Sequence, residues 1–456
     1  MARTSAKLPS GVRVSDHISL GVIARTFPLD EVRQVLAQSG RASRRQRDLP
    51  APVMVYYVIA LALYMGSSMR EVLRCLLEGL RVLWGPAAVK VAGKSAITQA
   101  RGRLGEEPLR QLYERLVRPI AVPATRGAWY RHWRLVSLDG STLDVADSAA
   151  NAAGFGRPGS GRGPGAFPQL RLVSLLENGT HVLFGACLGR YSEGESTLAR
   201  TVLAALRPGM LCLADRQFFS HALWRQALAT GADLLWRVKG DLRLPCETPL
   251  PDGSYLSTLY PTATERRRRQ NGVRVRVNEY RLSGKKDELY RLITTLLDPA
   301  AAPAEELAAL YHERWEIEGA LAEFKTHLRG ARMVLRSETP AMVRQEVWGL
   351  LLAHFAVRGL MHEAALQANE DPDRLSFLHA VRVIRRQLPL FAAFPPSAPC
   401  RPASPGAGRN PGRTRAKQPW PAEPAPRQTH AQRLQGEAPV PSANHQGGAC
   451  HQHTGA

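Results

Sequence analysis

The sequence lacks the features that define several large classes of protein. Its six cysteines include no Cys-x-x-Cys pair and no Cys/His spacing of metal ligands, which favours reduced thiols in a cytosolic protein. The most apolar stretch, 53–65, is too short to cross a bilayer and contains two tyrosines, so we interpret it as a buried helix. The basic N-terminus is followed by no long apolar segment, and we therefore expect neither a secretory signal nor a membrane partner.

Acidic residues are scarce relative to basic ones. Lysine and arginine number 61 against 39 aspartates and glutamates, a formal net charge of +22. Such an excess can neutralise many phosphates through counterion release, so we expect a nucleic acid as the partner. A basic surface that serves solubility or meets acidic lipids would give the same balance. With 44% hydrophobic residues, 456 positions can bury one large core or several smaller ones.

Nucleotide-binding motifs are present only in incomplete form. The segment 154–159 satisfies Gly-x-Gly-x-x-Gly, but it leads into a predicted strand where a dinucleotide site needs a helix, and a mobile loop explains it better. Gly93-Lys94-Ser95 ends like a phosphate-binding loop, yet Ala88 occupies the position of the required first glycine. We expect no nucleotide cofactor.

Two apolar strands each carry an acid where burial makes a charge costly. Asp139 lies in the strand pattern of 134–145, and Asp215 ends the strand pattern of 210–215. An acid in that position is usually salt-bridged or liganding something, and two of them suggest a common partner. Three further acids rank lower because a turn or a solvated face explains each: Asp144, Asp147 and Asp233.

A third acid lies in a spaced set of functional groups. Tyr311, Arg314, Glu318 and Lys325 are separated by two, three and six residues. On a regular helix, at about 100° per residue, the four fall near one face, with the carboxylate between two cations. An exposed helix with ion pairs between successive turns would also give this spacing.

This spacing resembles the signature of the insertion element 4 family of bacterial transposases, and the resemblance extends from about 14 to 390. It implies that Asp139, Asp215 and Glu318 are the catalytic, metal-binding carboxylates, which would hold two Mg²⁺ or Mn²⁺ ions. It also implies that Tyr311, Arg314 and Lys325 bind DNA phosphate.

The strand and helix patterns predict the order of a ribonuclease-H-like fold, an α/β class. Between Trp133 and Gly240 they predict three antiparallel strands, a helix, a strand, a helix and a strand. That order places the first strand beside the fourth, which would bring Asp139 near Asp215. We expect this catalytic domain to comprise 130–240 and 299–390.

Three other regions complete the predicted organisation. The first is an all-α N-terminal DNA-binding domain, 14–120, in which a helix capped by Ser95 offers Gln99, Arg101 and Arg103 as base-reading candidates; a solvated helix is the alternative. The second is a β-rich insertion, 241–298, which carries two groups of arginines that we expect to contact phosphate. Arg274 and Arg276 share one strand face, and the preceding run is Arg266, Arg267, Arg268 and Arg269. The tail, 395–456, is rich in proline, and we expect it to be disordered.

The resemblance implies a DNA transposase that cuts the ends of an insertion sequence and joins them to target DNA by metal-dependent phosphoryl transfer. Its partners would be double-stranded DNA, as terminal inverted repeats and target, and a second copy of the chain in a homodimeric synaptic complex. Such an enzyme would be cytoplasmic, in a bacterium, and associated with the nucleoid. Two alternatives stay open: a catalytically degenerate DNA-binding copy, for which the atypical tail argues, and a metal-dependent nuclease of the same fold.

Overall fold

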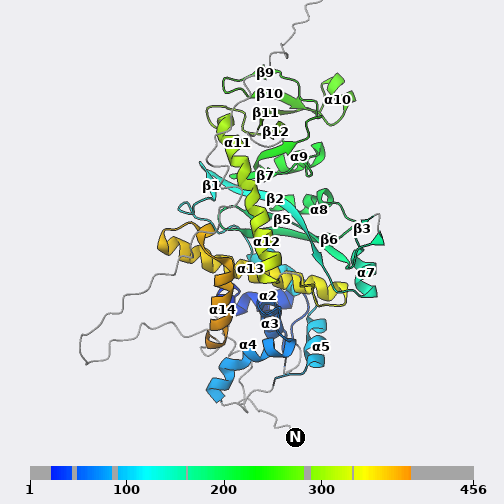
Figure 1. The fold of residues 1–456 in the computed structure, drawn as a ribbon, viewed down its shortest axis with the longest axis vertical. Helices are drawn as coiled ribbons and strands as arrows, with labels where there is room; N and C mark the ends of the chain where they lie inside the picture. The colour runs from blue at the N-terminus through cyan, green and yellow to red at the C-terminus, as the bar shows by residue number, and fades with distance from the viewer. Residues whose placement is uncertain are drawn as a thin grey trace, which may run out of the picture.

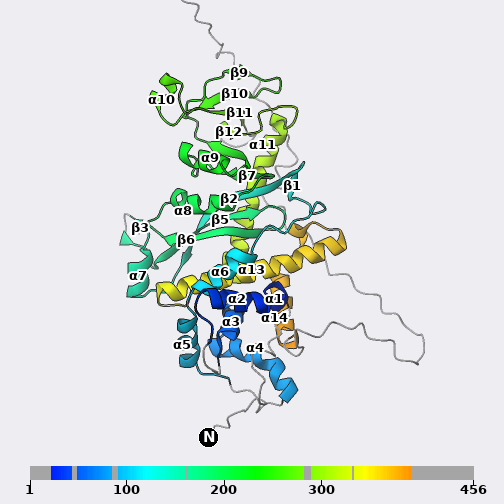
Figure 2. The same ribbon diagram turned by 180° about the vertical axis from the view of Figure 1, so that it is seen from behind.

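A computed structural model of the chain describes residues 22–43, 49–84, 91–160, 163–281, 289–330 and 333–391 (Figure 1). Helices gather at one end, a large sheet occupies the middle and the other end, and a long helix runs between them (Figures 1 and 2). The predicted tail, 395–456, lies outside the described residues. Among those residues, no helix combines the length and the apolar character that crossing a membrane would require.

The N-terminal region is helical, as predicted. Its third helix, predicted from the apolar run, begins after Pro50 and is buried on nearly every side, which an all-apolar sequence requires. The helix predicted to be capped by Ser95 begins at Lys94 instead, with Gly93 at the N-cap position. The helices are α1 (Val22–Thr26), α2 (Leu29–Gln38), α3 (Ala51–Leu63), α4 (Met69–Trp84), α5 (Lys94–Leu104) and α6 (Glu107–Leu116).

The central part has the strand and helix order predicted for a ribonuclease-H-like core. The first strand pairs antiparallel with the second in chain order and parallel with the fourth. In the sheet these strands follow the order β6-β5-β2-β7-β8. Their bounds are β2 (Trp133–Asp144), β5 (Gln169–Glu177), β6 (Val182–Arg190), β7 (Met210–Ala214) and β8 (Asp233–Val238), with α8 (Glu195–Val202), η2 (Leu203–Ala205) and α9 (His221–Leu228) between them.

Short elements surround this core. The Gly-rich segment predicted as a mobile loop begins with the end of a helix and continues as a two-stranded ribbon, and it leads into β5 as expected. A further short strand pairs with the start of β2. These elements are α7 (Ala149–Phe155), β3 (Gly159–Ser160), β4 (Gly163–Pro164) and β1 (Trp129–Tyr130).

The β-rich segment between the second aspartate and the Glu318 helix extends the same sheet. Its last strand pairs antiparallel with β8, so the sheet continues as β8-β12-β11-β10-β9 without a break. The sequence had indicated an insertion, and the structure adds that it is built edge to edge on the core. Its elements are β9 (Thr248–Pro249), β10 (Tyr255–Leu259), α10 (Ala263–Arg268), β11 (Val273–Arg281) and β12 (Leu289–Thr294).

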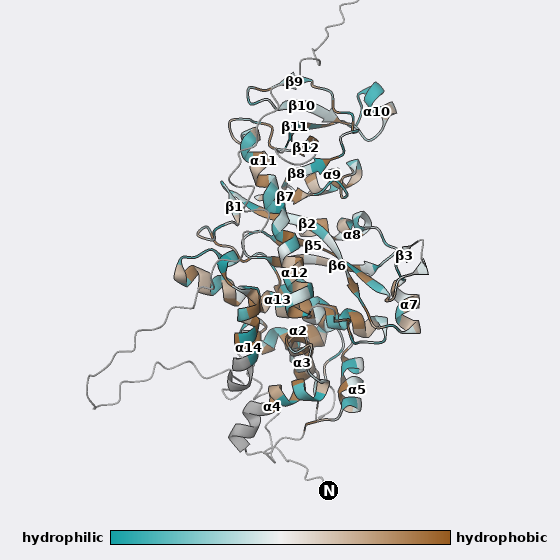
Figure 3. Cartoon of the chain, in the orientation of Figure 1, coloured by the Kyte–Doolittle hydropathy of each residue, from teal (hydrophilic) through white to brown (hydrophobic). Residues whose placement is uncertain are grey.

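The C-terminal helices join the sheet to the N-terminal helices. The 29-residue α13 packs against α3 and α6 on one side and β6 on the other, and α14 packs on α4 (Figure 1). Apolar residues concentrate where α13 meets α3, and one apolar core extends from the N-terminal helices into the sheet (Figure 3). The elements are α11 (Ala304–His312), η3 (Glu313–Trp315), α12 (Glu316–Ala322), η4 (Glu323–Leu328), α13 (Pro340–Ala368), η5 (Pro372–Arg374) and α14 (Phe377–Phe391).

Candidate active site

Asp139 and Asp215 lie side by side on one face of the sheet. The parallel register of β2 and β7 ends with Leu138 opposite Ala214, immediately before the two acids. Side chains alternate along a strand, so Asp139 shares a face with Leu135, which packs in the apolar cluster beneath α11. The same alternation places Asp215 on the face of Leu211 and Leu213, in that cluster. The two acids, 76 positions apart by their numbers, therefore point toward the helices that carry the motif residues.

Glu318 lies on α12, which packs against β2. The pKa of Asp139 is raised to about 6: burial raises it most, and the charges of Glu195 and Glu318 also raise it, whereas the Gly140 N–H and Arg314 lower it. Burial likewise raises the pKa of Glu318, with Asp215 contributing in the same direction and Arg314 opposing it. The three predicted acids thus share one electrostatic environment.

The arrangement suits a divalent cation. Three carboxylates repel one another here, one is held in a largely buried position, and hard divalent ions prefer carboxylate oxygen. The carboxylate oxygens of these three acids are not all within 4.8 Å of one another. Among the described residues, His181, Glu316 and Asp373 form a group whose ligand atoms are that close. The donor set and the like-charge repulsion nevertheless fit a site that a cation would neutralise.

Arg314 is the counter-charge of the site. Its Nη1 lies 3.6 Å from Asp139 Oδ2, and its guanidinium is 4.7 Å from the centre of the Trp315 ring. The residue is only 5% exposed, although it belongs to the η3 turn between two helices. A buried cation between carboxylates favours their ionised forms, and this is the effect of Arg314 on both Asp139 and Glu318.

Lys325 reaches β2 rather than Glu318. Its Nζ donates a hydrogen bond to Ser141 Oγ at 2.9 Å, two residues beyond Asp139. Burial lowers the pKa of Lys325, as does the nearby charge of Arg329. The predicted regular helix is wrong here. η4 is a π-helical turn that contains Lys325, so the rotation between Glu318 and Lys325 differs from that at about 100° per residue. η3, a 3-10 turn that contains Arg314, alters the rotation before Glu318.

Tyr311 does not occupy the predicted phosphate-binding position. The residue is 2% exposed, and its hydroxyl donates to the carbonyl oxygen of Ala214 at 3.4 Å. The phosphate-contact prediction is wrong for this residue because a buried hydroxyl paired with the backbone cannot meet a ligand without leaving its place. Tyr311 instead supports the end of β7, next to Asp215.

The competing acids have partners within the protein. Asp144 accepts from Gln169 Nε2 at 2.8 Å, and Asp147 pairs with Arg157. Asp233 accepts from the Trp133 indole at 2.7 Å and from Thr295 Oγ1 at 2.8 Å. These contacts give each acid a structural explanation.

Glu195 is a neighbour of the site that the sequence analysis missed. It begins α8, forms an ion pair with Arg171 at 3.2 Å and raises the pKa of Asp139 through its charge. A Cβ at Gly140 would meet Glu195 Cδ at 2.8 Å, so a glycine after Asp139 leaves room for this carboxylate. The glycine that follows Asp139 is a sequence signal of a close approach, but nothing in the sequence names the partner.

Of the three base-reading candidates on α5, one is buried and two are exposed. Arg101 is 3% exposed, with Nε donating to Gln345 Oε1 at 2.9 Å and Nη2 to Ser337 Oγ at 3.2 Å. The base-reading prediction is wrong for Arg101, because its guanidinium is committed to residues that precede and form α13. Gln99 and Arg103 are exposed and stay candidates.

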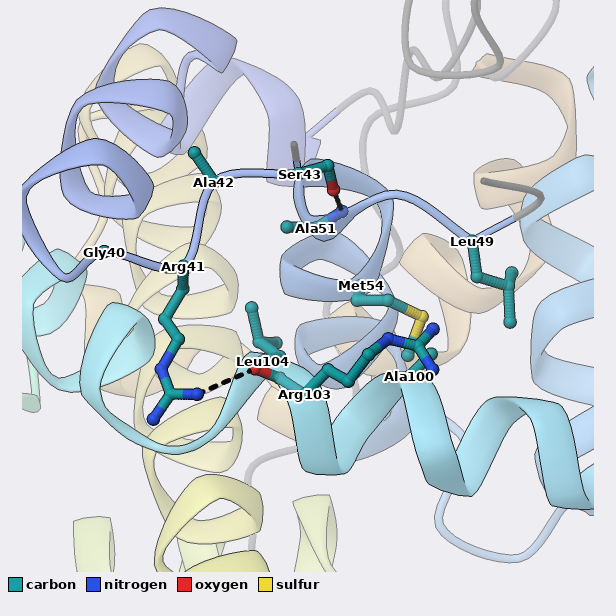
Figure 4. A pocket seen from close by; sticks show the side chains of 10 residues that line it. All are labelled: Gly40, Arg41, Ala42, Ser43, Leu49, Ala51, Met54, Ala100, Arg103 and Leu104. Atoms are coloured by element: carbon teal, nitrogen blue, oxygen red, sulfur yellow. Dashed lines mark hydrogen bonds between the residues drawn. The ribbon is translucent and has the colours of Figure 1, made fainter. Parts of the chain in front are cut away.

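Arg103 borders a pocket of about 240 Å³ between α5 and the segment after α2 (Figure 4). Its guanidinium extends over Met54, while Arg41 Nη1 donates to the Arg103 carbonyl oxygen at 3.2 Å (Figure 4). Two cationic residues thus line one pocket of the helical region.

The arginine run of the insertion also divides. Arg266, Arg267 and Arg268 end α10, and Arg269 follows with a left-handed φ of 52°. Arg267, Arg268 and Arg269 are exposed. Arg266 is partly buried, and its Nη2 donates to the Arg243 carbonyl oxygen at 2.8 Å. Arg276 is fully buried and paired with Asp252, so its predicted phosphate contact is wrong, because a salt bridge inside the protein satisfies it. Arg274 is exposed.

Two family models match successive parts of the chain. Residues 17–114 match a family described as insertion element 4 transposase N-terminal, and residues 133–356 match the transposase DDE domain. The chain is 29% identical over 374 residues to transposase InsG for insertion sequence element IS4 of Escherichia coli strain K12, covering 78% of this chain and 80% of InsG.

A solved piggyBac transposase synaptic complex with hairpin DNA is 10% identical, with a TM-score of 0.43, over 87% of this chain and 86% of that one. The assignment to a family rests on the two family models and on the similarity to InsG. A transposase DDE domain acts on DNA and depends on divalent metal ions. The chain belongs to the insertion element 4 family of transposases and is a DDE-type enzyme of DNA transposition.

Proposed function

We propose that Asp139, Asp215 and Glu318 are the catalytic carboxylates and together hold two Mg²⁺ or Mn²⁺ ions. The observation that carries this proposal is the register of β2 and β7, which ends at the two aspartates on the face covered by α11 and α12. Two electrostatic effects support it: the charge of Glu318 raises the pKa of Asp139, and the charge of Asp215 raises the pKa of Glu318. When bound, a pair of divalent ions activates the attacking oxygen and stabilises the leaving oxygen in phosphoryl transfer.

The chain's own residues would prepare this site in distinct ways. Arg314 favours the ionised forms of the acids, and its buried Nε has no hydrogen-bond partner within the part of the chain that the structure describes, which leaves donor capacity for a phosphate oxygen. Lys325, held by Ser141, places a second cation beside β2. Tyr311 positions the end of β7. The cations would therefore orient DNA phosphate while the carboxylates act at the scissile bond.

The DNA-facing surface would combine several exposed cations. Gln99 and Arg103 on α5 would read base edges in a terminal repeat, and Arg267 to Arg269 would contact phosphate together with the exposed part of Arg266. We propose the element's terminal inverted repeats and the target duplex as substrates, a homodimer as the synaptic form, and the nucleoid as the place of action.

A strand-transfer assay tests this function. Labelled DNA carrying the sequences that flank the gene is incubated with the full chain, Mg²⁺ or Mn²⁺ and a target plasmid. The proposal requires metal-dependent release of a 3′-end and its joining to the plasmid. Cleavage without joining would favour a nuclease, and binding without cleavage would favour a catalytically degenerate copy.

A further inference from the structure

A second group of metal-binding side chains lies behind the Glu318 helix. His181 follows the turn between β5 and β6, Glu316 begins α12, and Asp373 lies in η5 after α13. Glu316 and Glu318 are two residues apart, about 200° around a helix, so they face opposite sides of α12. The group is therefore separate from the proposed catalytic carboxylates.

The ligand atoms have the spacing of a coordination shell. His181 Nε2 lies 3.0 Å from Asp373 Oδ1 and 3.7 Å from Glu316 Oε2, and all three ligand atoms are within 4.8 Å of one another. Ligands that bind one ion at about 2.1 Å, with angles between 90° and 110°, lie about 3.0–3.4 Å apart. The observed separations are close to that range.

The histidine nitrogen at the centre is buried between two carboxylates. His181 is 7% exposed, and its Nε2 makes no hydrogen bond among the described residues, although two carboxylates lie beside it. Two carboxylates converge on this one buried nitrogen, and Asp373 is close enough to form an ion pair with it, so a bound cation would serve both carboxylates at once. An imidazole and two carboxylates form a donor set suited to Zn²⁺.

The surroundings complete the pattern of a metal-binding histidine. The other ring nitrogen, Nδ1, lies 3.6 Å from Glu323 Oε1, and Arg358 contacts both Nδ1 and Glu323. A carboxylate behind the imidazole is the usual outer partner that orients a metal-binding histidine. With a neutral imidazole, a divalent ion and Arg358 would balance the three carboxylates of Glu316, Glu323 and Asp373.

The charges around the imidazole also favour a cation at this place. Glu316 and Asp373 lie beside its Nε2, and Glu323 lies beside its Nδ1. A divalent ion would offset the repulsion between the carboxylates that face Nε2.

We propose that His181, Glu316 and Asp373 form a structural site for a divalent transition-metal ion of the Zn²⁺ type. The ion would tie the β5–β6 turn and the segment after α13 to α12, and so fix the helix that carries Glu318. The side chain of Asp373 is 33% exposed, which provides a route of entry. The proposal does not depend on the assignment of the catalytic carboxylates.

Metal content of the full-length, tag-free chain tests the site. The parent for the experiment carries Asp139→Asn and Glu318→Gln, so that the other acidic site cannot account for bound zinc. After equilibration with Zn²⁺ and removal of free metal, zinc is measured in the parent, in His181→Asn and in Asp373→Asn. Asparagine is chosen at position 181 because it tolerates the left-handed φ of 57° found there. Asp371→Asn is the matched control, since Asp371 accepts from the Asp373 N–H and is not in the ligand group.

The parent and Asp371→Asn should retain about one zinc per chain more than His181→Asn and Asp373→Asn. Zinc held elsewhere on the chain would be common to all four and would cancel in the comparison. As a second readout, Zn²⁺ should raise the unfolding temperature of the parent and of Asp371→Asn but not of the other two. Equal zinc content in all four proteins, or equal shifts in unfolding temperature, would overturn the proposal.

Discussion

Arg314 and Asp139 form an ion pair between the η3 turn and the first core strand, with Nη1 3.6 Å from Oδ2. The motif spacing assigned this arginine to Glu318 alone. In the structure it lowers the pKa of both acids, so one buried cation acts on residues 179 positions apart by number. In this site the positive charge of Arg314 lowers the carboxyl pKa values and the neighbouring carboxylates raise them. Each effect can be tested by removing one charge.

Asp139 should make the metal-free protein less stable as pH rises. Burial raises its pKa from 3.8 to about 6, so the folded state holds the proton more tightly than the unfolded chain does. The stabilisation is complete below about pH 4 and is lost as pH rises to about 6, a change of about 2–3 kcal/mol. Chemical unfolding from pH 3.5 to 7.5 should show this loss in the wild type and not in Asp139→Asn. Added Mg²⁺ should reduce it; identical pH profiles for the two proteins would count against a raised pKa.

Two substitutions should move the Asp139 titration in opposite directions. Glu195→Gln removes a charge that raises the pKa, so the midpoint should move to lower pH; Arg314→Ala removes a charge that lowers it, so the midpoint should move higher. Glu193→Gln, which removes a charge two residues before α8, is the control. NMR titration of the aspartate carboxyl carbons would measure the midpoints. Shifts of the same sign in both variants would refute this charge balance.

Lys325→Ala should weaken DNA binding without sequence preference. Its ammonium lies beside β2 at the site, where a phosphate would pass. Loss of one phosphate contact should reduce the slope of log affinity against log salt by about 0.9. Arg374→Ala removes an exposed cation that pairs with Glu370 and serves as the control. Binding titrations at several salt concentrations measure the slope, and an unchanged slope in Lys325→Ala would remove this lysine from the phosphate contacts.

Arg101 should matter for stability and not for base preference. Its substitution by methionine leaves Gln345 and Ser337 without their buried partner, at a cost of about 1–3 kcal/mol. Arg103→Ala should leave stability within about 0.5 kcal/mol, because that side chain is exposed. Denaturant unfolding and DNA binding to altered repeat sequences separate the two roles. A stable Arg101→Met protein with relaxed base preference would contradict the buried position.

The sequence predicted the parts of the fold that depend on local patterns. Apolar runs predicted the strands that carry Asp139 and Asp215, β2 and β7, and the helix expected after the second of them is α9, which Ser220 caps. The strand order then followed from the ribonuclease-H-like resemblance, and the β2–β7 pairing confirms it. The roles of the three acids stay predictions.

Other features depend on contacts between distant residues. Arg101 is buried by Gln345, 244 positions later, and no pattern around α5 reveals that partner. The predicted regular helix around Glu318 was wrong because the chain forms the η3 and η4 turns there, and spacing at about 100° per residue assumes an uninterrupted α-helix. Glu195 was missed for the same reason, since its closeness to Asp139 arises only when α8 packs on the sheet.

The most direct test of the account is metal-dependent strand cleavage by Asp139→Asn and Glu318→Gln on DNA carrying the gene's flanking sequences. Both changes keep the shape of the side chain and remove a charge that would hold the metal. We predict that each variant loses Mg²⁺-dependent cleavage and strand transfer while binding the same DNA with near wild-type affinity. Wild-type cleavage rates in either variant would contradict the assignment of the catalytic carboxylates.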